Sequence, residues 1–92
     1  EDRAEKYISI EHRRKQNLYV ERGYALIETG YYREGILQLR KAILEDPKSP
    51  AVPVILTKIA DGYNSLGEYD NAFIELEKME ALITLIVDRT SA

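Results

Sequence analysis

The chain has 92 residues, of which 45% are hydrophobic and 32% charged, a balance typical of one small folded domain rather than a disordered chain. Its net charge of −3 gives no general attraction to nucleic acid, and the absence of cysteine excludes disulfides and thiolate chemistry. The longest apolar run, residues 82–87, is far shorter than the ~20 residues that cross a bilayer. We therefore expect neither nucleic-acid binding nor membrane insertion.

Charge is spread unevenly along the chain. Residues 1–41 carry nine Lys or Arg against seven Asp or Glu, whereas residues 42–92 carry four against nine. A basic front half and an acidic back half could attract each other, within one molecule or between two. No signal-peptide pattern is visible. We expect a cytoplasmic protein, with an exported protein trimmed of its signal as the alternative because the chain starts at Glu1.

The first 29 residues contain no proline and are predicted to be helical. Apolar residues recur there at three- and four-residue spacing, from Ala4 to Leu26. The polar stretch EHRRKQN, residues 11–17, interrupts this pattern, so either one long helix runs through it or a short first helix ends there. Gly30 ends the helix, since glycine readily adopts the left-handed conformation of a C-terminal cap.

A second and a third helix are predicted around a proline-rich linker. The second covers about residues 33–45 and ends before Pro47, which disfavours helical geometry at the preceding residue. Ser49 and Pro50 have the pattern of an N-cap and a first helical residue. Pro53 is expected to delay the regular helix by a few residues.

Gly67 ends the third helix after Leu66 and begins the turn to a fourth. Asp70 is expected to cap the fourth helix, which continues without a helix breaker to about Asp88. No strand pattern occurs anywhere in the chain. The predicted fold class is therefore all-α, with four helices and short turns.

The turn sequence GYYREG, residues 30–35, is repeated 37 residues later as GEYDNA, residues 67–72. Superposing the two turns also aligns the helices on either side of them. The aligned pairs are Tyr19/Leu56, Gly23/Ala60, Leu26/Tyr63, Tyr32/Tyr69, Gly35/Ala72, Leu39/Leu76 and Ala42/Met79. Over residues 17 to about 85, this pattern resembles the tetratricopeptide repeat, a helix-turn-helix unit of 34 residues. An unrelated helical bundle with coincidental turns is the alternative.

The resemblance implies a right-handed superhelical stack of two such hairpins, preceded by an N-terminal helical extension. The expected units are the extension (1–16), the first repeat (17–48), the second repeat with its extended last helix (49–88) and a tail (89–92). Small residues at matching positions should let the helices of each hairpin touch, Gly23 on Gly35 and Ala60 on Ala72. The chain departs from the family pattern at Arg22, where the family has leucine, and at Thr84, where it has a closing proline.

Two tyrosines, Tyr32 and Tyr69, directly follow the turns and are expected to fill the gap toward the next element of the stack. No catalytic or metal-binding set of residues is visible beside them. His12, the only histidine, lies in the basic stretch and is expected to be a solvated surface side chain. Acidic pairs such as Glu75 and Glu77 are expected on helix surfaces. We predict a non-enzymatic protein with no cofactor and no bound metal.

Proteins of this family bind an extended peptide or a partner's helix in a concave groove lined by the first helices of successive repeats. Carried onto this sequence, the groove residues would be Val20, Tyr24, Ile27, Glu28, Tyr31, Thr57, Asp61 and Asn64. The positions that would clamp a partner's C-terminal carboxylate carry no cation here, so that type of groove is not expected. We expect Tyr24 and Tyr31 to be exposed and to contact a protein or peptide partner, unless the N-terminal residues fold back over them.

The last helix has an apolar surface that no further repeat covers within the sequence. Its residues are Met79, Leu82, Ile83, Ile86 and Val87. In the family, a next repeat or a polar capping helix normally covers such a surface. The alternative function is therefore an assembly element. It would form a homodimer through this helix across a two-fold axis, or belong to a larger repeat protein.

Overall fold

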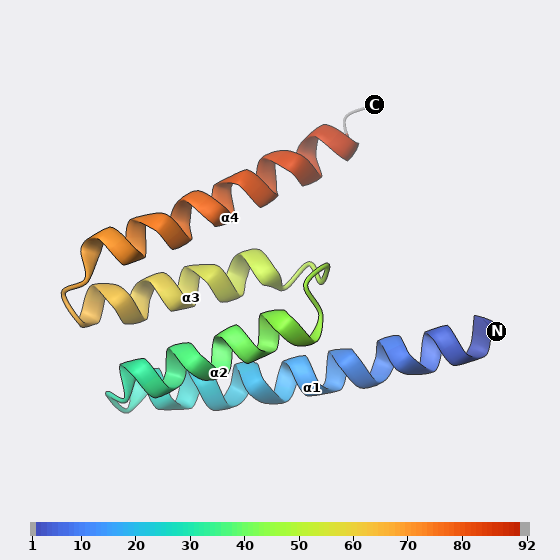
Figure 1. The fold of residues 1–92 in the computed structure, drawn as a ribbon, viewed down its shortest axis with the longest axis horizontal. Helices are drawn as coiled ribbons and strands as arrows, with labels where there is room; N and C mark the ends of the chain where they lie inside the picture. The colour runs from blue at the N-terminus through green and yellow to red at the C-terminus, as the bar shows by residue number, and fades with distance from the viewer. Residues whose placement is uncertain (1, 91–92) are drawn as a thin grey trace.

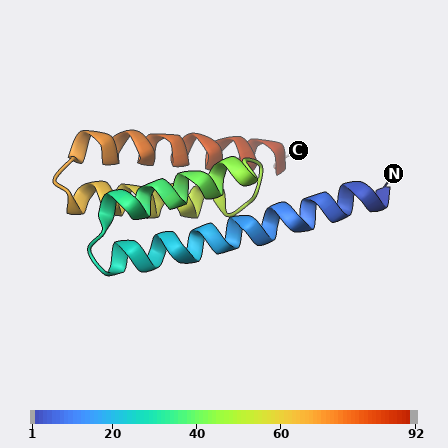
Figure 2. The same ribbon diagram turned by 60° about the horizontal axis from the view of Figure 1, so that its bottom comes forward.

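The computed structural model describes residues 2–90, with side chains for residues 9–89, and confirms the all-α class. Its helices are α1 (Asp2–Glu28), α2 (Tyr32–Glu45), α3 (Val52–Ser65) and α4 (Tyr69–Thr90), and no strand occurs in residues 2–90. The helices form two antiparallel hairpins, α1 with α2 and α3 with α4 (Figure 1). The hairpins meet mainly through α2 and α3, and α4 lies on the far side of α3 from α1 (Figure 2).

The first helix runs unbroken through the polar stretch at residues 11–17, which decides between the two sequence-based alternatives. Gln16 in this stretch is buried, and its Nε2 donates hydrogen bonds of 3.0 Å to the backbone oxygens of Ala42 and Asp46. His12 is half-exposed, with Nδ1 2.8 Å from Oε1 of Glu45, so it is not the fully solvated side chain that was expected. These contacts fix α1 against the C-terminal end of α2, where the last carbonyl groups of a helix lack partners.

Both hairpin turns have the same hydrogen-bonding geometry. Gly30 and Gly67 have φ angles of +94° and +76°, as predicted for left-handed C-terminal caps. The amide of Tyr31 donates to the carbonyl of Leu26 at 2.8 Å, and the amide of Glu68 donates to that of Tyr63 at 2.9 Å. In both turns an amide donates to the carbonyl five residues earlier, directly after a glycine with positive φ. This pattern defines a Schellman motif. The sequence repeat at the turns is therefore also a repeat of backbone structure.

A salt bridge joins the two turns, which lie at the same end of the molecule (Figure 1). Its partners are the Arg33 guanidinium, just after the first turn, and the Glu68 carboxylate in the second turn. The second carboxylate oxygen of Glu68 accepts a hydrogen bond of 2.9 Å from Asn71 Nδ2. The prediction that Asp70 caps α4 is wrong. The helix already begins at Tyr69, so Asp70 lies inside its first turn and not before it.

The linker between the hairpins ends in a capped turn. The hydroxyl of Ser49 accepts a hydrogen bond of 3.1 Å from the amide of Ala51. The N-cap of α3 is Ala51, however, so the prediction that Ser49 is the N-cap and Pro50 the first helical residue is wrong. The regular helix begins only at Val52, because the intervening residues form a tighter turn in which the Val52 amide bonds to the Ser49 carbonyl. Pro53 lies within the first helical turn, where a missing amide hydrogen has no effect on the helix.

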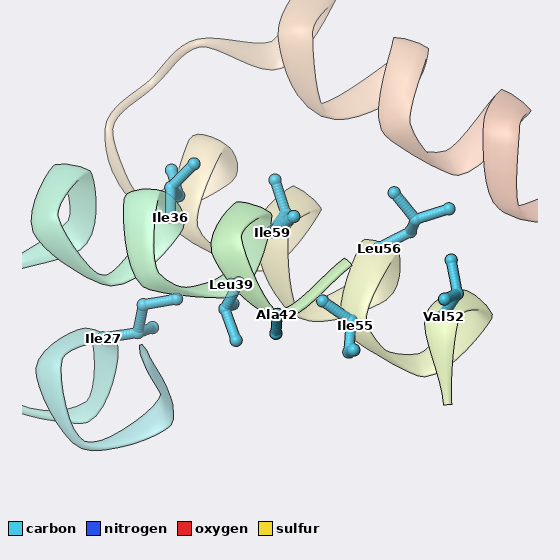
Figure 3. Packing of buried hydrophobic residues seen from close by; sticks show 8 residues of the cluster. All are labelled: Ile27, Ile36, Leu39, Ala42, Val52, Ile55, Leu56 and Ile59. Carbon is cyan, nitrogen blue, oxygen red and sulfur yellow. The ribbon is translucent and has the colours of Figure 1, made fainter. Parts of the chain in front are cut away.

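The core lies between α1, α2 and α3 (Figure 3). Its buried members are Ile27, Ile36, Leu39, Ala42, Val52, Ile55, Leu56 and Ile59. The predicted contact of Gly23 with Gly35 is confirmed: a Cβ added to Gly35 would lie 2.9 Å from the Gly23 carbonyl oxygen and 2.5 Å from Ile27 Cγ1. Ala60 and Ala72 are both buried in the second hairpin. In the first hairpin, the two glycines thus allow the helices to approach closely. In the second hairpin, the two alanines at the matching positions are buried.

Candidate interaction surfaces

A salt bridge within the chain joins α1 and α3 on the predicted concave face. Nζ of Lys58 lies 2.9 Å from Oε1 of Glu28 and 5.0 Å from the centre of the Tyr24 ring. The hydrogen bond from Lys58, together with its charge, lowers the pKa of Glu28 below its usual value. The same hydrogen bond raises the pKa of Lys58. Lys58 therefore occupies the place beside Tyr24 that a partner was expected to take.

The other predicted groove residues are divided between the core and the surface. Ile27 is only 7% exposed, so its assignment to the groove is wrong. It follows the buried Gly23 by four residues and therefore lies on the face of α1 that packs against the other helices. Tyr24 and Val20 are half-buried against the core, so Tyr24 is less exposed than expected. Residues 3–15 do not fold back over Tyr24, because they belong to the continuous helix α1 (Figure 1).

Four groove residues remain on the surface, apart from Glu28. They are Tyr31, Thr57, Asp61 and Asn64. The hydroxyl oxygen of Thr57 lies 3.1 Å from both the Pro53 carbonyl oxygen and Met79 Sδ, the two acceptors for its one proton, so it faces α4 rather than a groove. Of the predicted groove, only these four residues and Glu28 are thus exposed.

An ionic network around the buried Glu75 connects α2, α3 and α4, and sequence reasoning missed it. Glu75 is 1% exposed, although it was expected on a helix surface. Arg40 donates from Nη2 to the Glu75 carboxylate and, at 2.9 Å, to the hydroxyl of Tyr63. Nζ of Lys78 lies 3.4 Å from the other Glu75 oxygen. Burial alone would lower the pKa of Arg40, but its hydrogen bonds to Tyr63 and Glu75 raise it overall.

A stripe of mostly apolar side chains runs along the outside of α4 at regular spacing. We call it the α4 stripe, and its members are Tyr69, Phe73, Leu76, Glu80, Ile83 and Val87. They follow each other at alternating spacings of four and three residues, the heptad pattern of a helix that packs against another helix. Phe73 is 63% exposed and Tyr69 is 68% exposed.

The corresponding positions of α2 are more enclosed. Subtracting the repeat length of 37 residues takes Tyr69, Phe73, Leu76 and Glu80 to Tyr32, Ile36, Leu39 and Ile43. Ile36 is 5% exposed because it packs against α3 at Gly62. Leu39 is 0% exposed because it packs against Gly23 of α1, and Tyr32 and Ile43 are partly buried. Phe73 of the α4 stripe therefore lies where, one repeat earlier, α2 is covered by α3.

The residues predicted for self-association lie only partly on this stripe. Met79 and Leu82 are half-buried and pack against the core of their own chain, so they do not form an open surface. Ile83, Ile86 and Val87 are about half-exposed. Tyr69 was expected to fill a gap toward a next element of the stack. The sequence analysis did not use the heptad spacing of Tyr69, Phe73 and Ile83, which was the signal for this stripe.

No group of His, Cys, Asp and Glu side chains in the described part of the chain is arranged to hold a metal ion. None of the helices within residues 2–90 has the length and apolar content needed to cross a membrane. Comparison of the chain with protein-family models, curated proteins and solved structures found no match. The resemblance to the tetratricopeptide repeat therefore stays a prediction that is based on residues and turn geometry.

Proposed function

We propose that this chain is a non-enzymatic protein-interaction module built from two hairpins of the tetratricopeptide type. In this proposal, the α4 stripe binds a helix of a partner protein or of a further repeat. The single observation that supports it most is the contrast between α2 and α4. Ile36 of α2 is 5% exposed beneath α3, whereas its counterpart Phe73 on α4 is 63% exposed.

The exposed area is large enough to favour binding. Fully burying one large apolar side chain contributes ~1.5–3 kcal/mol, so covering Tyr69, Phe73, Ile83 and Val87 would contribute several kcal/mol. A small domain has a total stability of only about 5–15 kcal/mol, so this is a substantial contribution. The concave face offers less, because Lys58 and Glu28 already satisfy each other there.

The stripe also indicates the chemistry of its partner. Glu80 lies in the middle of it, at the position where α2 has Ile43. A partner helix with Lys or Arg opposite Glu80 would pair with the carboxylate while its apolar residues cover Phe73 and Ile83. A homodimer of α4 helices remains the second candidate, supported by the exposed Ile83, Ile86 and Val87. It is less favourable because a pair that uses the whole stripe places two Glu80 carboxylates in an apolar interface.

Selection of helical peptides on the immobilised chain tests the proposal. Selected peptides should carry apolar residues at heptad spacing and bind wild type with measurable affinity. Their affinity should fall at least about tenfold for Phe73→Asp and for Ile83→Asp, because each change places a charge in the stripe. Leu44→Asp is the matched control, since Leu44 is a highly exposed residue of α2 outside the stripe. A selected peptide that binds Phe73→Asp and Ile83→Asp as tightly as it binds Leu44→Asp and wild type would contradict the proposal.

A further inference from the structure

A second surface lies between α2 and the C-terminal half of α4, where α4 diverges from α3 (Figure 1). Two adjoining hollows of about 500 Å³ and 350 Å³ share Pro47, Val52, Leu82 and Leu85 in their walls. We call this continuous surface the α2–α4 groove. It points away from the α4 stripe, since Lys78 and Leu85 lie on a different face of the helix from Phe73 and Ile83.

The groove has an apolar floor and walls. Val52 and Leu56 of α3 form its floor and are themselves almost completely buried. Ile43 of α2 lines one wall, and Leu82 and Leu85 of α4 line the other. Leu85 is about half-exposed, so an occupant of the groove would remove apolar surface from water.

The charged residues that line this groove are all cations. They are Arg40, Lys48, Lys78 and Arg89, and no Asp or Glu lines it among the described residues. Residues 42–92 contain only four Lys or Arg against nine Asp or Glu, and three of those four cations are Lys48, Lys78 and Arg89. The groove therefore gathers most of the cations of the acidic half of the chain.

The buried Glu75 neutralises only part of this positive charge. It pairs with Arg40 and Lys78 at the inner end of the groove. Lys48 and Arg89 line the outer end, 41 positions apart in the chain. Glu75 pairs with neither of them in the described ion pairs, so a ligand with a carboxylate would meet a net positive charge there.

We propose that the α2–α4 groove binds an acidic amphipathic peptide segment of a partner protein. Its apolar side chains contact Ile43, Leu82 and Leu85, and its carboxylates pair with Lys48 and Arg89 at the outer end. Lys78 and Arg89 are eleven residues apart on α4, which corresponds to about 17 Å along a helix. A bound segment of about three helical turns matches this length. This site is separate from the α4 stripe and does not depend on the function proposed for it.

The test uses two labelled helical peptides of twelve residues. One has Leu at heptad spacing and Glu at both ends, and the other has Lys in place of every Glu. Fluorescence anisotropy at low salt should show the acidic peptide binding at least about tenfold more tightly than the basic one. Its affinity should fall several-fold between about 50 mM and 300 mM salt, because exposed charge pairs are screened.

Paired variants locate the site. Lys48→Glu combined with Arg89→Glu should weaken binding of the acidic peptide at least about tenfold. Lys15→Glu combined with Lys41→Glu changes the net charge equally, at exposed positions outside the groove, and should change the affinity less than about twofold. Phe73→Asp should also leave it unchanged, which separates this proposal from the one for the α4 stripe. Circular dichroism confirms the fold of each variant.

Three outcomes would overturn the proposal. The first is equal affinity for the acidic and the basic peptide. The second is an equal loss of affinity in the control pair, which would indicate attraction to the whole molecule rather than to the groove. The third is a chain that dimerises on its own and becomes monomeric in the Lys48→Glu, Arg89→Glu variant, which would assign the groove to a second copy.

Discussion

Gly35 shows how strongly one position can constrain the first hairpin. Its neighbours are a backbone oxygen, that of Gly23, and the branched side chain of Ile27. The backbone oxygen cannot move aside without displacing α1. A side chain at position 35 must therefore push the two helices apart.

We expect Gly35→Leu to destabilise the fold by about 1–3 kcal/mol, because the added side chain overpacks the contact between α1 and α2. Thermal and urea unfolding followed by circular dichroism measure the change. Ala25→Leu is a suitable control, since Ala25 is an exposed residue of α1 and should change stability by less than about 0.5 kcal/mol. An unaltered midpoint for Gly35→Leu would contradict the packing of α1 on α2.

The ion pair of Glu28 and Lys58 has a consequence for pH dependence. Since Lys58 lowers the pKa of Glu28, the pair contributes stability above the usual carboxyl pKa and loses it as pH falls through the lowered value. NMR titration of the Glu28 carboxyl group should give a pKa below 4.5 in wild type. Lys58→Met should raise this pKa, because it removes the hydrogen bond and the charge while keeping a long side chain. The same pKa in both proteins would show that the two side chains do not interact in solution.

At the scale of the elements, most of what could be predicted from the sequence has a local cause. Gly30 and Gly67 end helices through their own backbone preference, and Ser49 caps a turn with its own hydroxyl. The burial of Glu75 could not be predicted in this way, because it depends on Arg40, which is 35 positions away in the chain.

The exposure of Ile27 was also mispredicted, for a similar reason. The alignment of repeats places Ile27 opposite the exposed Asn64, but Ile27 packs against Gly35 of α2 and lies beside Gly62 of α3. Equivalent residues of the two hairpins therefore have different surroundings. The α4 stripe differs from its counterpart on α2 for the same reason.

The shared turn geometry leads to a prediction for α3 and α4. Gly67→Ala should destabilise the fold by about 1–2 kcal/mol, since alanine is strained at a φ of +76°. Chemical synthesis of the chain allows D-alanine at the same position, which favours positive φ and adds the same methyl group. The D-alanine protein should be at least as stable as wild type. Equal destabilisation by both isomers would mean that the methyl group, and not backbone strain, is responsible.

At the scale of the whole molecule, our proposal makes the α4 stripe the surface at which chains associate. The described heptad positions of α4 are otherwise apolar or aromatic around Glu80. Removing this charge should therefore change the self-association of the chain more than its folding stability.

We expect Glu80→Leu to promote self-association, because it makes the α4 stripe continuously apolar. Sedimentation between about 10 and 200 μM should show a mass that rises above the 10.6 kDa of one chain at lower concentration than for wild type. Glu77→Leu removes the same charge beside the stripe and should have a smaller effect. Adding Phe73→Asp to Glu80→Leu should restore the behaviour of wild type. A Glu80→Leu protein that stays monomeric throughout would count against the stripe as an interface.

The divergence of α4 from α3 leads us to expect local opening at the C-terminal end of α4. Near the turns, α4 is held by Ala72 in the hairpin interior and by the link between Arg33 and Glu68. Toward its C-terminal end, Leu85 and Val87 are about half-exposed and much less of the helix is enclosed. Local opening requires less free energy where fewer apolar contacts are broken. The last turns of α4 can therefore fray and re-form while the hairpin stays folded, so their amide hydrogens would exchange with deuterium well before those near Ala72.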